Sequence, residues 1–453
     1  MIKDIELMEK LVSLCKRRGF IYQGSEIYGG LAGTWDYGPL GLALKKNIEN
    51  LWWRFFVDSR DDMYGIDSAI LMNPRVWEAS GHVGGFSDPL VEDKKTKKRY
   101  RADHLLEEVG VDPKGMSLED MGKAIIEKKI KSPDGNDLTA PQQFNMMFRT
   151  SVGSVEGGDM TVYLRPETAQ GMFVNFKNIL DSYHPKLPFG IAQIGRSFRN
   201  EIAPRDFIFR VRELEIMEFE YFLKAEQWKE SFEYWVKQMR TWFELIGFSK
   251  EDIKEVEIEE GDRAHYSKRT VDFHFNYPHK FDEIAGLAYR TDFDLKNHIE
   301  HSGKDLSYLN LDNTRSVPHA LEPTFGLGRH VLAVISKAYT EDELGGEKRI
   351  FLKFPLNLAP IKAAIFPLLK NKSDLVNKAR EVYTMLKKQL PQIMFDDNGN
   401  IGKRYRRQDE IGTPYCITID FDTLNDNAVT IRERDSGKQE RVAISDILSK
   451  ITS

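Results

Sequence analysis

The sequence predicts an α+β fold of two or three domains that ends in a compact α/β module. Its 453 residues exceed what a single compact core usually holds. Residues 189–222 have the pattern of two adjacent strands joined by a loop. Beyond residue 360, strands and helices alternate at lengths typical of an α/β module with its own sheet.

The composition is that of a globular protein, for which the cytoplasm is the expected location. Hydrophobic residues make up 41% and charged residues 30%, and no apolar run is long enough to span a membrane. Acidic side chains near the N-terminus argue against a secretory signal. Cys15 and Cys416 form neither a disulfide framework nor a zinc-ligand spacing. Because the net charge is −5, a nucleic-acid partner would need a local basic patch.

Two helices are predicted in the N-terminal part. Residues 2–18 carry apolar side chains at helical spacing, and Gly19 suits a helix end. After the glycine-rich residues 29–41, a second helix is expected to begin at Pro39 and to carry a bulky apolar stripe as far as Phe55. The stripe fits a core helix, and it also fits a subunit interface, which favours large aromatic side chains.

Residues 91–154 differ in character and are predicted to be an insertion. A basic run occupies residues 94–99, and a turn is expected at residues 133–135. A solvated charged face is the simplest explanation of the run, and contact with RNA phosphate is the alternative.

The strand pair at residues 189–222 is the main candidate for a ligand site. Its second strand, expected over residues 207–222, alternates apolar residues with arginines and glutamates. Buried charges must be paired or serve a ligand, so we expect phosphate at the arginines and an ammonium or adenine amino group at the carboxylates. An exposed hairpin stabilised by salt bridges is the alternative.

Further elements follow the strand pair. A helix is predicted at residues 226–248 and two strands at residues 270–294. Residues 325–338 have the pattern of a glycine turn that runs into a helix, with Arg329 near the helix start, where phosphate is favoured. Many glycine turns only satisfy backbone geometry, so this turn is weak support when taken alone.

The C-terminal module carries a basic segment. Strands are expected at residues 361–366, 392–395 and 415–420, helices at residues 373–390 and at the chain end, and a hairpin turn at residues 435–437. Lys403, Arg404, Arg406 and Arg407 surround Tyr405, a composition that suits single-stranded RNA because phosphates are neutralised and bases stack. An exposed basic helix is the alternative.

Several long motifs resemble one family. RSFRNE (196–201) and FRVRELE (209–215) resemble motif 2 of class II aminoacyl-tRNA synthetases, and LEPTFGLGR (321–329) resembles motif 3. YLRPETAQGMFVNF (163–176) is similar to a segment of the homodimeric glycyl-tRNA synthetases. IYGGLAGTWDYGPLG (27–41) and IGKRYRRQDEIGTPYCI (401–417) extend the resemblance over most of the chain.

The resemblance implies a fold, a reaction and partners. We expect a class II antiparallel-sheet catalytic domain at residues 1–90 and 155–358, the insertion at 91–154, and an α/β anticodon-binding domain at 359–453. The implied reaction uses ATP and Mg²⁺ to attach glycine to tRNA(Gly) through a glycyl-adenylate. A homodimer through the helix that begins at Pro39 is also implied, with no membrane association.

The resemblance also assigns roles to individual residues. Arg199 and Arg329 are the implied catalytic residues, and Glu283 is the implied magnesium ligand. The implied ATP-binding residues are Arg199, Asn200, Glu201, Phe209, Arg210, Val211, Arg212, Glu213, Leu214, Glu283, Ile284, Gly326, Leu327, Gly328 and Arg329. The implied glycine-binding residues are Arg101, Glu167, Leu214, Glu215, Ile216, Met217, Glu218, Arg290, Glu322, Pro323, Thr324, Phe325 and Gly326. The implied anticodon contacts are Lys403, Arg404, Tyr405, Arg406 and Arg407.

Three positions depart from the resembled pattern. Leu214 stands where the family has a phenylalanine that stacks on adenine, which removes an aromatic contribution of roughly 0.5–1.5 kcal/mol. Ile216 stands in place of glutamine and Thr324 in place of serine. None of these changes removes a charge that the chemistry needs.

A non-catalytic protein of the same fold is the alternative function. Accessory subunits of mitochondrial DNA polymerase resemble these synthetases but typically lack the charges of motifs 2 and 3. Arg199, Glu201 and Arg329 are all retained here, which favours the enzyme.

Overall fold

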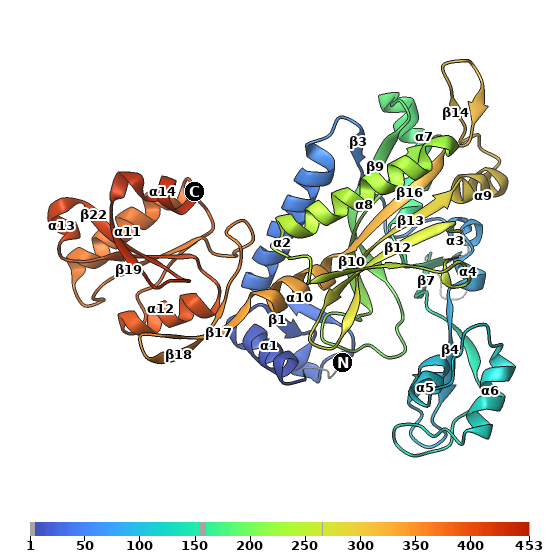
Figure 1. Ribbon diagram of the computed structural model, residues 1–453, viewed down its shortest axis with the longest axis horizontal. Helices are drawn as coiled ribbons and strands as arrows, with labels where there is room; N and C mark the ends of the chain where they lie inside the picture. The colour runs from blue at the N-terminus through green and yellow to red at the C-terminus, as the bar shows by residue number, and fades with distance from the viewer. Residues whose placement is uncertain (1–4, 154–159, 265, 453) are drawn as a thin grey trace.

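The structure is a computed structural model that describes residues 5–153, 160–264 and 266–452 (Figure 1). Residues 2–4 of the first predicted helix and the predicted domain boundary between residues 154 and 155 lie outside these ranges. Within these ranges, no helix is both long and apolar enough to cross a membrane.

A seven-stranded sheet forms the centre of the larger domain (Figure 1). Its order is β11, β12, β13, β16, β10, β9, β3, and neighbours are antiparallel except for β3 and β9. β10 therefore lies inside the sheet, between β16 and β9. The bounds are β3 (Met63–Gly65), β9 (Phe189–Phe198), β10 (Glu213–Leu223), β11 (Ile253–Glu257), β12 (Arg269–Asn276), β13 (Phe281–Thr291) and β16 (His319–Gly326).

Helices cover both faces of this sheet. Met217 and Phe219 of β10 share one apolar cluster with α2, α8 and α10, whereas Phe222 shares another with α7 and α9. Since side chains alternate along a strand, Glu218 and Glu220 point to the same face as Phe222. The helices are α2 (Pro39–Trp53), α7 (Ala169–Tyr183), α8 (Trp228–Leu245), α9 (Phe293–Ser302) and α10 (Leu327–Ala338).

The bulky apolar stripe of α2 lies in the core of the chain itself. α2 begins at Pro39, as the sequence predicts, and runs into a π-helical turn, η2. Trp52 is fully buried, and its ring contacts Phe219 and Phe325. Core packing therefore accounts for the aromatic bulk that also suggested a subunit interface. The neighbouring elements are α1 (Ile5–Arg18), β1 (Ile21–Gln23), β2 (Trp35–Tyr37) and η2 (Arg54–Asp58).

The loop of the central hairpin is longer than the sequence predicts. A strand is expected over residues 207–222, but β10 begins at Glu213, and residues 199–212 form the connection. Asp206 and Phe207 both have a φ angle of 58°, which is incompatible with a strand. Arg212 fixes the loop, because its guanidinium donates to the carbonyl oxygens of Ala32 and Glu201 at 2.8 and 3.2 Å.

The insertion forms a small module beside the sheet domain (Figure 1). Its own buried cluster includes Val91, Leu106 and Ile125, and its sheet has the order β5, β4, β6. β4 begins at Ser87, before the predicted start at residue 91. The bounds are β4 (Ser87–Glu92), β5 (Arg99–Arg101), α5 (Ala102–Glu108), α6 (Leu118–Glu127) and β6 (Gln142–Asn145), and α3 (Arg75–Ala79), α4 (His82–Gly85), β7 (Arg149–Val152) and β8 (Met160–Tyr163) flank the module in sequence.

The C-terminal module has a five-stranded sheet in the order β20, β19, β21, β22, β23. The first three strands are parallel and the others antiparallel. α11 and α14 pack in one cluster, and the basic segment forms α12, which packs in another. The bounds are β19 (Ala363–Pro367), α11 (Ser373–Lys387), β20 (Ile393–Phe395), α12 (Ile401–Glu410), β21 (Tyr415–Ile419), α13 (Thr423–Asp426), β22 (Ala428–Glu433), β23 (Gln439–Ala443) and α14 (Ile447–Thr452).

Two further hairpins lie outside these sheets. β14 (Tyr308–Leu309) and β15 (Arg315–Ser316) project from the sheet domain near α9 (Figure 1). β17 (Tyr339–Leu344) and β18 (Glu347–Leu352) lie between the sheet domain and the C-terminal module.

Candidate active site

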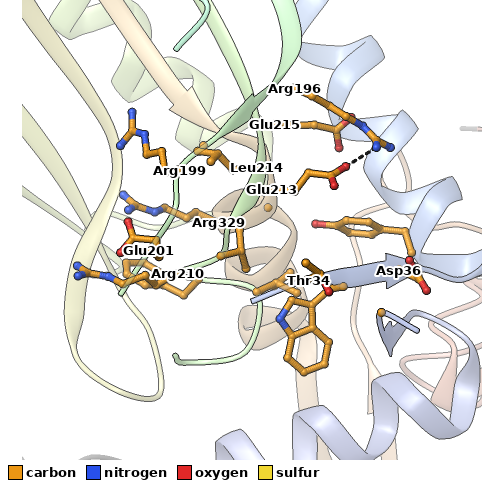
Figure 2. Close-up of a pocket in the computed structure, with 18 of the residues that line it drawn as sticks. Thr34, Asp36, Arg196, Arg199, Glu201, Arg210, Glu213, Leu214, Glu215 and Arg329 are labelled. Carbon is orange, nitrogen blue, oxygen red and sulfur yellow. Dashed lines mark hydrogen bonds and ion pairs between the residues drawn. The ribbon is translucent and has the colours of Figure 1, made fainter. Parts of the chain in front are cut away.

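A cavity of about 790 Å³ opens beside the ends of β9 and β10 (Figure 2). The β9–β10 loop, the start of α10, residues 24–45 and two residues of the insertion, Arg101 and Met146, form its walls. The predicted site residues that line it are Arg101, Arg199, Glu201, Phe209, Arg210, Val211, Glu213, Leu214, Glu215, Glu283, Gly326, Gly328 and Arg329.

Three guanidinium groups lie on one side of the cavity, near the Glu201 carboxylate (Figure 2). Arg199 Nε donates to the carbonyl oxygen of Pro166 at 3.1 Å, and its guanidinium lies 5.5 Å from the Phe86 ring centre. Among the described residues, no carboxylate forms an ion pair with Arg199 or Arg210. Burial lowers the pKa of Arg210. Unpaired cations in a cavity suit an anionic ligand.

Arg329, the third of these groups, is positioned by a strand-to-helix turn. β16 ends at Gly326, which caps α10 and so places Arg329 in the first helical turn. Arg329 Nη1 donates to the Glu283 carboxylate at 2.9 Å, and the guanidinium lies 4.5 Å from the Phe209 ring centre. Although burial acts in the opposite direction, the charge of Arg329 lowers the pKa of Glu283. The helix N-terminus adds partial positive charge to this wall.

A second carboxyl group accompanies Glu283. Asp272 lies on β12 opposite Gly286 of β13, and the sequence analysis did not single it out. Burial and the charge of Glu283 raise the pKa of Asp272 to about 7. Because the neighbouring carboxyl groups of Asp272 and Glu283 repel each other when both are ionised, the pair suits a bound cation.

The wall at Leu214 suits an aromatic base. Leu214 is half-buried at the start of β10 and offers an apolar surface to the cavity. The buried Oε2 atom of Glu201 accepts no hydrogen bond from any residue in the described ranges. An apolar surface beside an unused acceptor is what a nucleobase with an exocyclic amino group requires.

Three predicted carboxylates converge on the face of β10 that also carries Leu214. Glu218 of β10, Glu322 of β16 and Glu167, which precedes α7, are all buried. Arg290 of β13 donates to Glu322 at 2.6 Å and lies 4.0 Å from Glu167. The cluster thus contains more carboxyl groups than fixed cations.

Hydroxyl groups hold Glu218 from two directions. Thr168 and Thr324 donate to its two carboxylate oxygens at 2.5 and 2.7 Å. Burial and the charge of Glu167 nevertheless raise the pKa of Glu218. A buried carboxylate with spare acceptor positions and a raised pKa is prepared to receive a cation.

Glu167 is held by residues that the sequence analysis did not identify. His82 lies 3.2 Å from one of its oxygens, and Gln170 donates to the other at 3.0 Å. Although burial opposes the effect, His82 lowers the pKa of Glu167. Gln170 also donates to Asp294, which holds Arg290. Single histidine and glutamine residues carry no distinctive sequence signal, so only the quoted segment around Glu167 could have pointed to this network.

Strand alternation separates Glu213 and Glu215 from the carboxylate cluster. Both point to the opposite face of β10 from Glu218, where Glu213 pairs with Arg196 and Glu215 accepts from Lys45 at 2.5 Å. Glu215 lines the cavity next to Lys45 of α2, apart from the carboxylate cluster, and its contact with glycine stays a prediction.

Other predicted residues support the site without facing it. The side chains of Met217, Ile284, Phe325 and Leu327 belong to the main hydrophobic core. Their main-chain contact with a ligand stays a prediction. Pro323 lies on the same side of β16 as Phe325, by the alternation of the strand, whereas Ile216 is buried on the Glu218 side.

Arg212 and Asn200 are predicted ATP-binding residues that anchor the β9–β10 loop. Arg101 is a predicted glycine-binding residue that lies at the cavity. Arg212 holds the β9–β10 loop and does not line the cavity, and Asn200 N donates to the Met146 carbonyl oxygen at 2.7 Å. Arg101 lines the cavity rather than the carboxylate cluster and pairs with Asp88 and Asp103 at 2.7 and 2.6 Å.

The basic segment of the C-terminal module divides into interior and surface residues. Arg404 is 1% exposed and donates to three main-chain carbonyl oxygens, so the expectation that it contacts RNA is wrong. Tyr405 is half-buried and its hydroxyl bonds Thr418 at 2.7 Å. Lys403, Arg406 and Arg407 line a shallow groove together with Arg18.

Family models match two regions of this chain. Residues 151–338 match the tRNA synthetase class II core domain (G, H, P, S and T). Residues 362–453 match the anticodon binding domain. The first match includes Arg199, Arg210 and Arg329 of the cavity and the carboxylate cluster.

Similar proteins are found over the whole length. A glycine--tRNA ligase of Lysinibacillus sphaericus is 48% identical, and one of Clostridium acetobutylicum is 49% identical, each match covering 98% of both chains. A solved structure of Giardia lamblia prolyl-tRNA synthetase in complex with prolyl-adenylate is similar in fold, with a TM-score of 0.69 and 16% identity, covering 98% of this chain and 75% of that one.

Proposed function

The chain belongs to the glycine--tRNA ligase family of class II aminoacyl-tRNA synthetases, and from that premise we propose that it activates glycine with ATP and transfers it to tRNA(Gly). One observation carries the proposal. Arginines without acid partners face a cavity beside β9 and β10, and β10 also carries Glu218 of a buried carboxylate cluster. Such a site can hold a polyphosphate and an ammonium group side by side.

The first step is an in-line displacement at phosphorus. A carboxylate oxygen of glycine attacks the α-phosphorus of ATP, the bond to the bridging oxygen breaks, and pyrophosphate leaves with the electron pair. Charge develops on phosphoryl oxygens, so fixed cations contribute most. Arg199 would hold the α-phosphate and the attacking carboxylate, and Arg329 the γ-phosphate end, with Arg210 adding a phosphate contact.

The second step is acyl transfer. A terminal ribose hydroxyl of the tRNA attacks the carbonyl carbon of the glycyl-adenylate, and AMP leaves. Throughout, Glu201 would accept a hydrogen bond from the adenine amino group while Leu214 covers the ring. The role of Glu201 is supported by its unused Oε2 atom.

Glycine would be recognised by its ammonium group. Glu167, Glu218 and Glu322 supply acceptors for the three ammonium donors. Thr324 bonds Glu218 through its hydroxyl, which leaves its methyl group to restrict space for a larger amino acid. Glycine has no smaller competitor, so a steric wall is sufficient for selectivity.

Magnesium fits the carboxyl pair of Glu283 and Asp272. Magnesium prefers oxygen ligands and is usually bound by one or two carboxylates together with substrate phosphates. No group of three or more candidate metal ligands occurs among the described residues. When bound, the ion would neutralise charge on the phosphates.

The remaining parts would bind the larger partners. We assign tRNA recognition to the C-terminal module, where Lys403 and Arg406 lie beside an open groove. We also propose a homodimer that forms through α2 and the segment that precedes it in the chain. In that segment Ile27 and Tyr28 are each 88% exposed. Large exposed apolar side chains of this kind mark protein interfaces.

Amino-acid-dependent exchange between pyrophosphate and ATP tests the proposal. We expect exchange with glycine at least roughly a thousandfold faster than with alanine, about 4 kcal/mol. An absence of exchange with all amino acids would favour a non-catalytic protein, and faster exchange with another amino acid would contradict the assigned substrate.

A further inference from the structure

Glu220 is a buried carboxyl group that the proposed mechanism does not use. It is fully buried on β10, and neither of its carboxyl oxygens has a hydrogen-bond partner among the described residues. A buried polar group without a partner is costly and calls for an explanation, such as a role in a ligand site.

The position of Glu220 connects it to the carboxylate cluster. It follows Glu218 by two residues and therefore points to the same face of β10. The register between β10 and β16 places it opposite Glu322. On the β9 side its neighbour is Ile191, which is uncharged.

The charged groups around Glu220 come from four elements. They are Glu322 of β16, Arg290 of β13, Glu218 of β10 itself and Asp294 of α9. Three of these four groups are acidic, and the one cation is already bonded to Glu322 and Asp294. Burial and the charge of Glu322 raise the pKa of Glu220 well above its usual range.

Hydrogen bonding distinguishes Glu220 from the other carboxyl groups. Glu218 accepts from two hydroxyl groups and Glu322 accepts from Arg290, and such bonds favour the ionised form. Glu220 receives no such support. When the site is empty, a proton held by the cluster is therefore best placed on Glu220.

We propose that Glu220 carries the proton of the cluster while the amino-acid site is empty and releases it to solvent when the ammonium group of glycine binds near Glu218 and Glu322. The inference rests on the proposed glycine site. Glycine enters with its positive charge, the O–H bond of Glu220 breaks, and the resulting carboxylate restores the charge balance. Glu220 is a positioning residue, because it sets the charge behind the groups that contact substrate.

The proposal predicts how glycine binding depends on pH. Because one proton leaves as glycine binds, glycine affinity should rise with pH by up to tenfold per pH unit while Glu220 is protonated in the free enzyme. The glycine concentration for half-maximal pyrophosphate exchange, measured from pH 6 to pH 8.5, should fall accordingly. In Glu220→Gln this dependence should be lost, whereas the ATP concentration for half-maximal exchange should depend on pH as in the unmodified protein.

Calorimetry gives a direct count of protons. Glycine titrated at pH 7 in phosphate and in Tris buffer should show release of up to one proton from the unmodified protein and close to none from Glu220→Gln. Glu220→Met should show the same loss together with a higher Tm, because it removes the unpartnered polar group. Glu230→Gln, an exposed change on α8, is the matched control and should keep the proton release.

The possible outcomes separate this inference from the proposed function. Equal proton release by the unmodified protein and Glu220→Gln would overturn the role of Glu220 while leaving glycine activation intact. A glycine requirement that does not change with pH in the unmodified protein would also overturn it. Failure of the unmodified protein to exchange pyrophosphate with glycine would instead overturn the proposed function.

Discussion

At the scale of single residues, the arginines of the cavity differ in what fixes them. Arg199 uses one main-chain carbonyl and a ring face, which leaves its two terminal nitrogens available. Arg329 shares its charge with Glu283. Arg196 pairs with Glu213 on the other side of the cavity, so it is already neutralised. Whether an arginine has an acidic partner therefore indicates whether its guanidinium is available to bind a phosphate.

Arg199→Ala and Arg329→Ala should each reduce glycine-dependent pyrophosphate exchange by roughly 10²- to 10³-fold, because each removes a cation from developing phosphoryl charge. Circular dichroism and Tm should show an intact fold. Arg240→Ala, an exposed residue paired with Glu255, is the control and should exchange normally. Exchange within about tenfold of the unmodified protein, 1.4 kcal/mol, would contradict the assignment.

Thr324 allows its hydroxyl and methyl groups to be tested separately. Thr324→Ser keeps the bond to Glu218 and removes the methyl group, so discrimination against alanine should fall by roughly tenfold or more, while the glycine requirement changes little. Thr324→Val keeps a similar shape and removes the hydroxyl, so the glycine requirement should rise. Exchange assays with glycine and alanine measure both effects. Identical behaviour of the two variants would show that Thr324 does not face the amino acid.

At the scale of elements, α10 and β10 position the site. α10 begins directly after β16, so the strand-to-helix turn determines where Arg329 lies. One turn of α10 is anchored through His330, which accepts from Trp242 of α8 at 3.1 Å and bonds the Gly326 carbonyl oxygen at 2.8 Å. β10 presents alternate residues to two layers, and only one of these layers contains the carboxylate cluster.

The anchoring of α10 should make the protein sensitive to acid. Burial lowers the pKa of His330 from 6.5 to about 4. The imidazole of His330 binds a proton more readily in the unfolded state than in the folded state. The contribution of neutral His330 to the free energy of unfolding is therefore fully present above pH 6.5 and is lost as pH falls towards 4. At pH 5 the loss from this residue should be about 2 kcal/mol. His330→Gln should have a lower Tm at pH 7 but a smaller decrease in Tm between pH 7 and pH 5. An equal decrease in both proteins would show that His330 is not responsible.

At the scale of the whole molecule, buried charges join the two domains. Arg349 of β18 donates to Asp409 of α12 at 3.1 Å and to the carbonyl oxygen of Arg434 at 2.7 Å. Arg434 in turn donates to the carbonyl oxygen of Phe354 at 3.1 Å. Removal of the chain after about residue 360 would leave Arg349 without these partners, so substitutions at the surface are a cleaner test of the C-terminal module.

Lys403→Ala combined with Arg406→Ala should raise the tRNA concentration needed for charging and leave pyrophosphate exchange unchanged, because the catalytic cavity is untouched. For each phosphate contact that is lost, the slope of the logarithm of tRNA affinity against the logarithm of salt concentration should become shallower by about 0.7. Arg404→Met is the internal control: it should lower the Tm of the module, because buried carbonyl oxygens lose their donor. An unchanged tRNA requirement in the double variant would assign tRNA binding to another surface.

The sequence by itself determined the charged motifs, the order of most helices and strands, and the family. These features depend on local spacing, and Pro39 and Arg329 lie at helix starts as their neighbours predict. It also marked Glu167, Glu218 and Glu322 as one group, although they are distant in the chain.

Only the tertiary structure decided which marked residues face the site. The alternating pattern could not show that Glu215 faces α2, or that residues 207–212 form a loop, since strand pairing and register are set by contacts between distant segments. It could not show that Arg404 is interior, because burial depends on packing against the module sheet. The roles of Thr168 and His82, and the isolation of Glu220, likewise arise from elements that meet only in the folded chain.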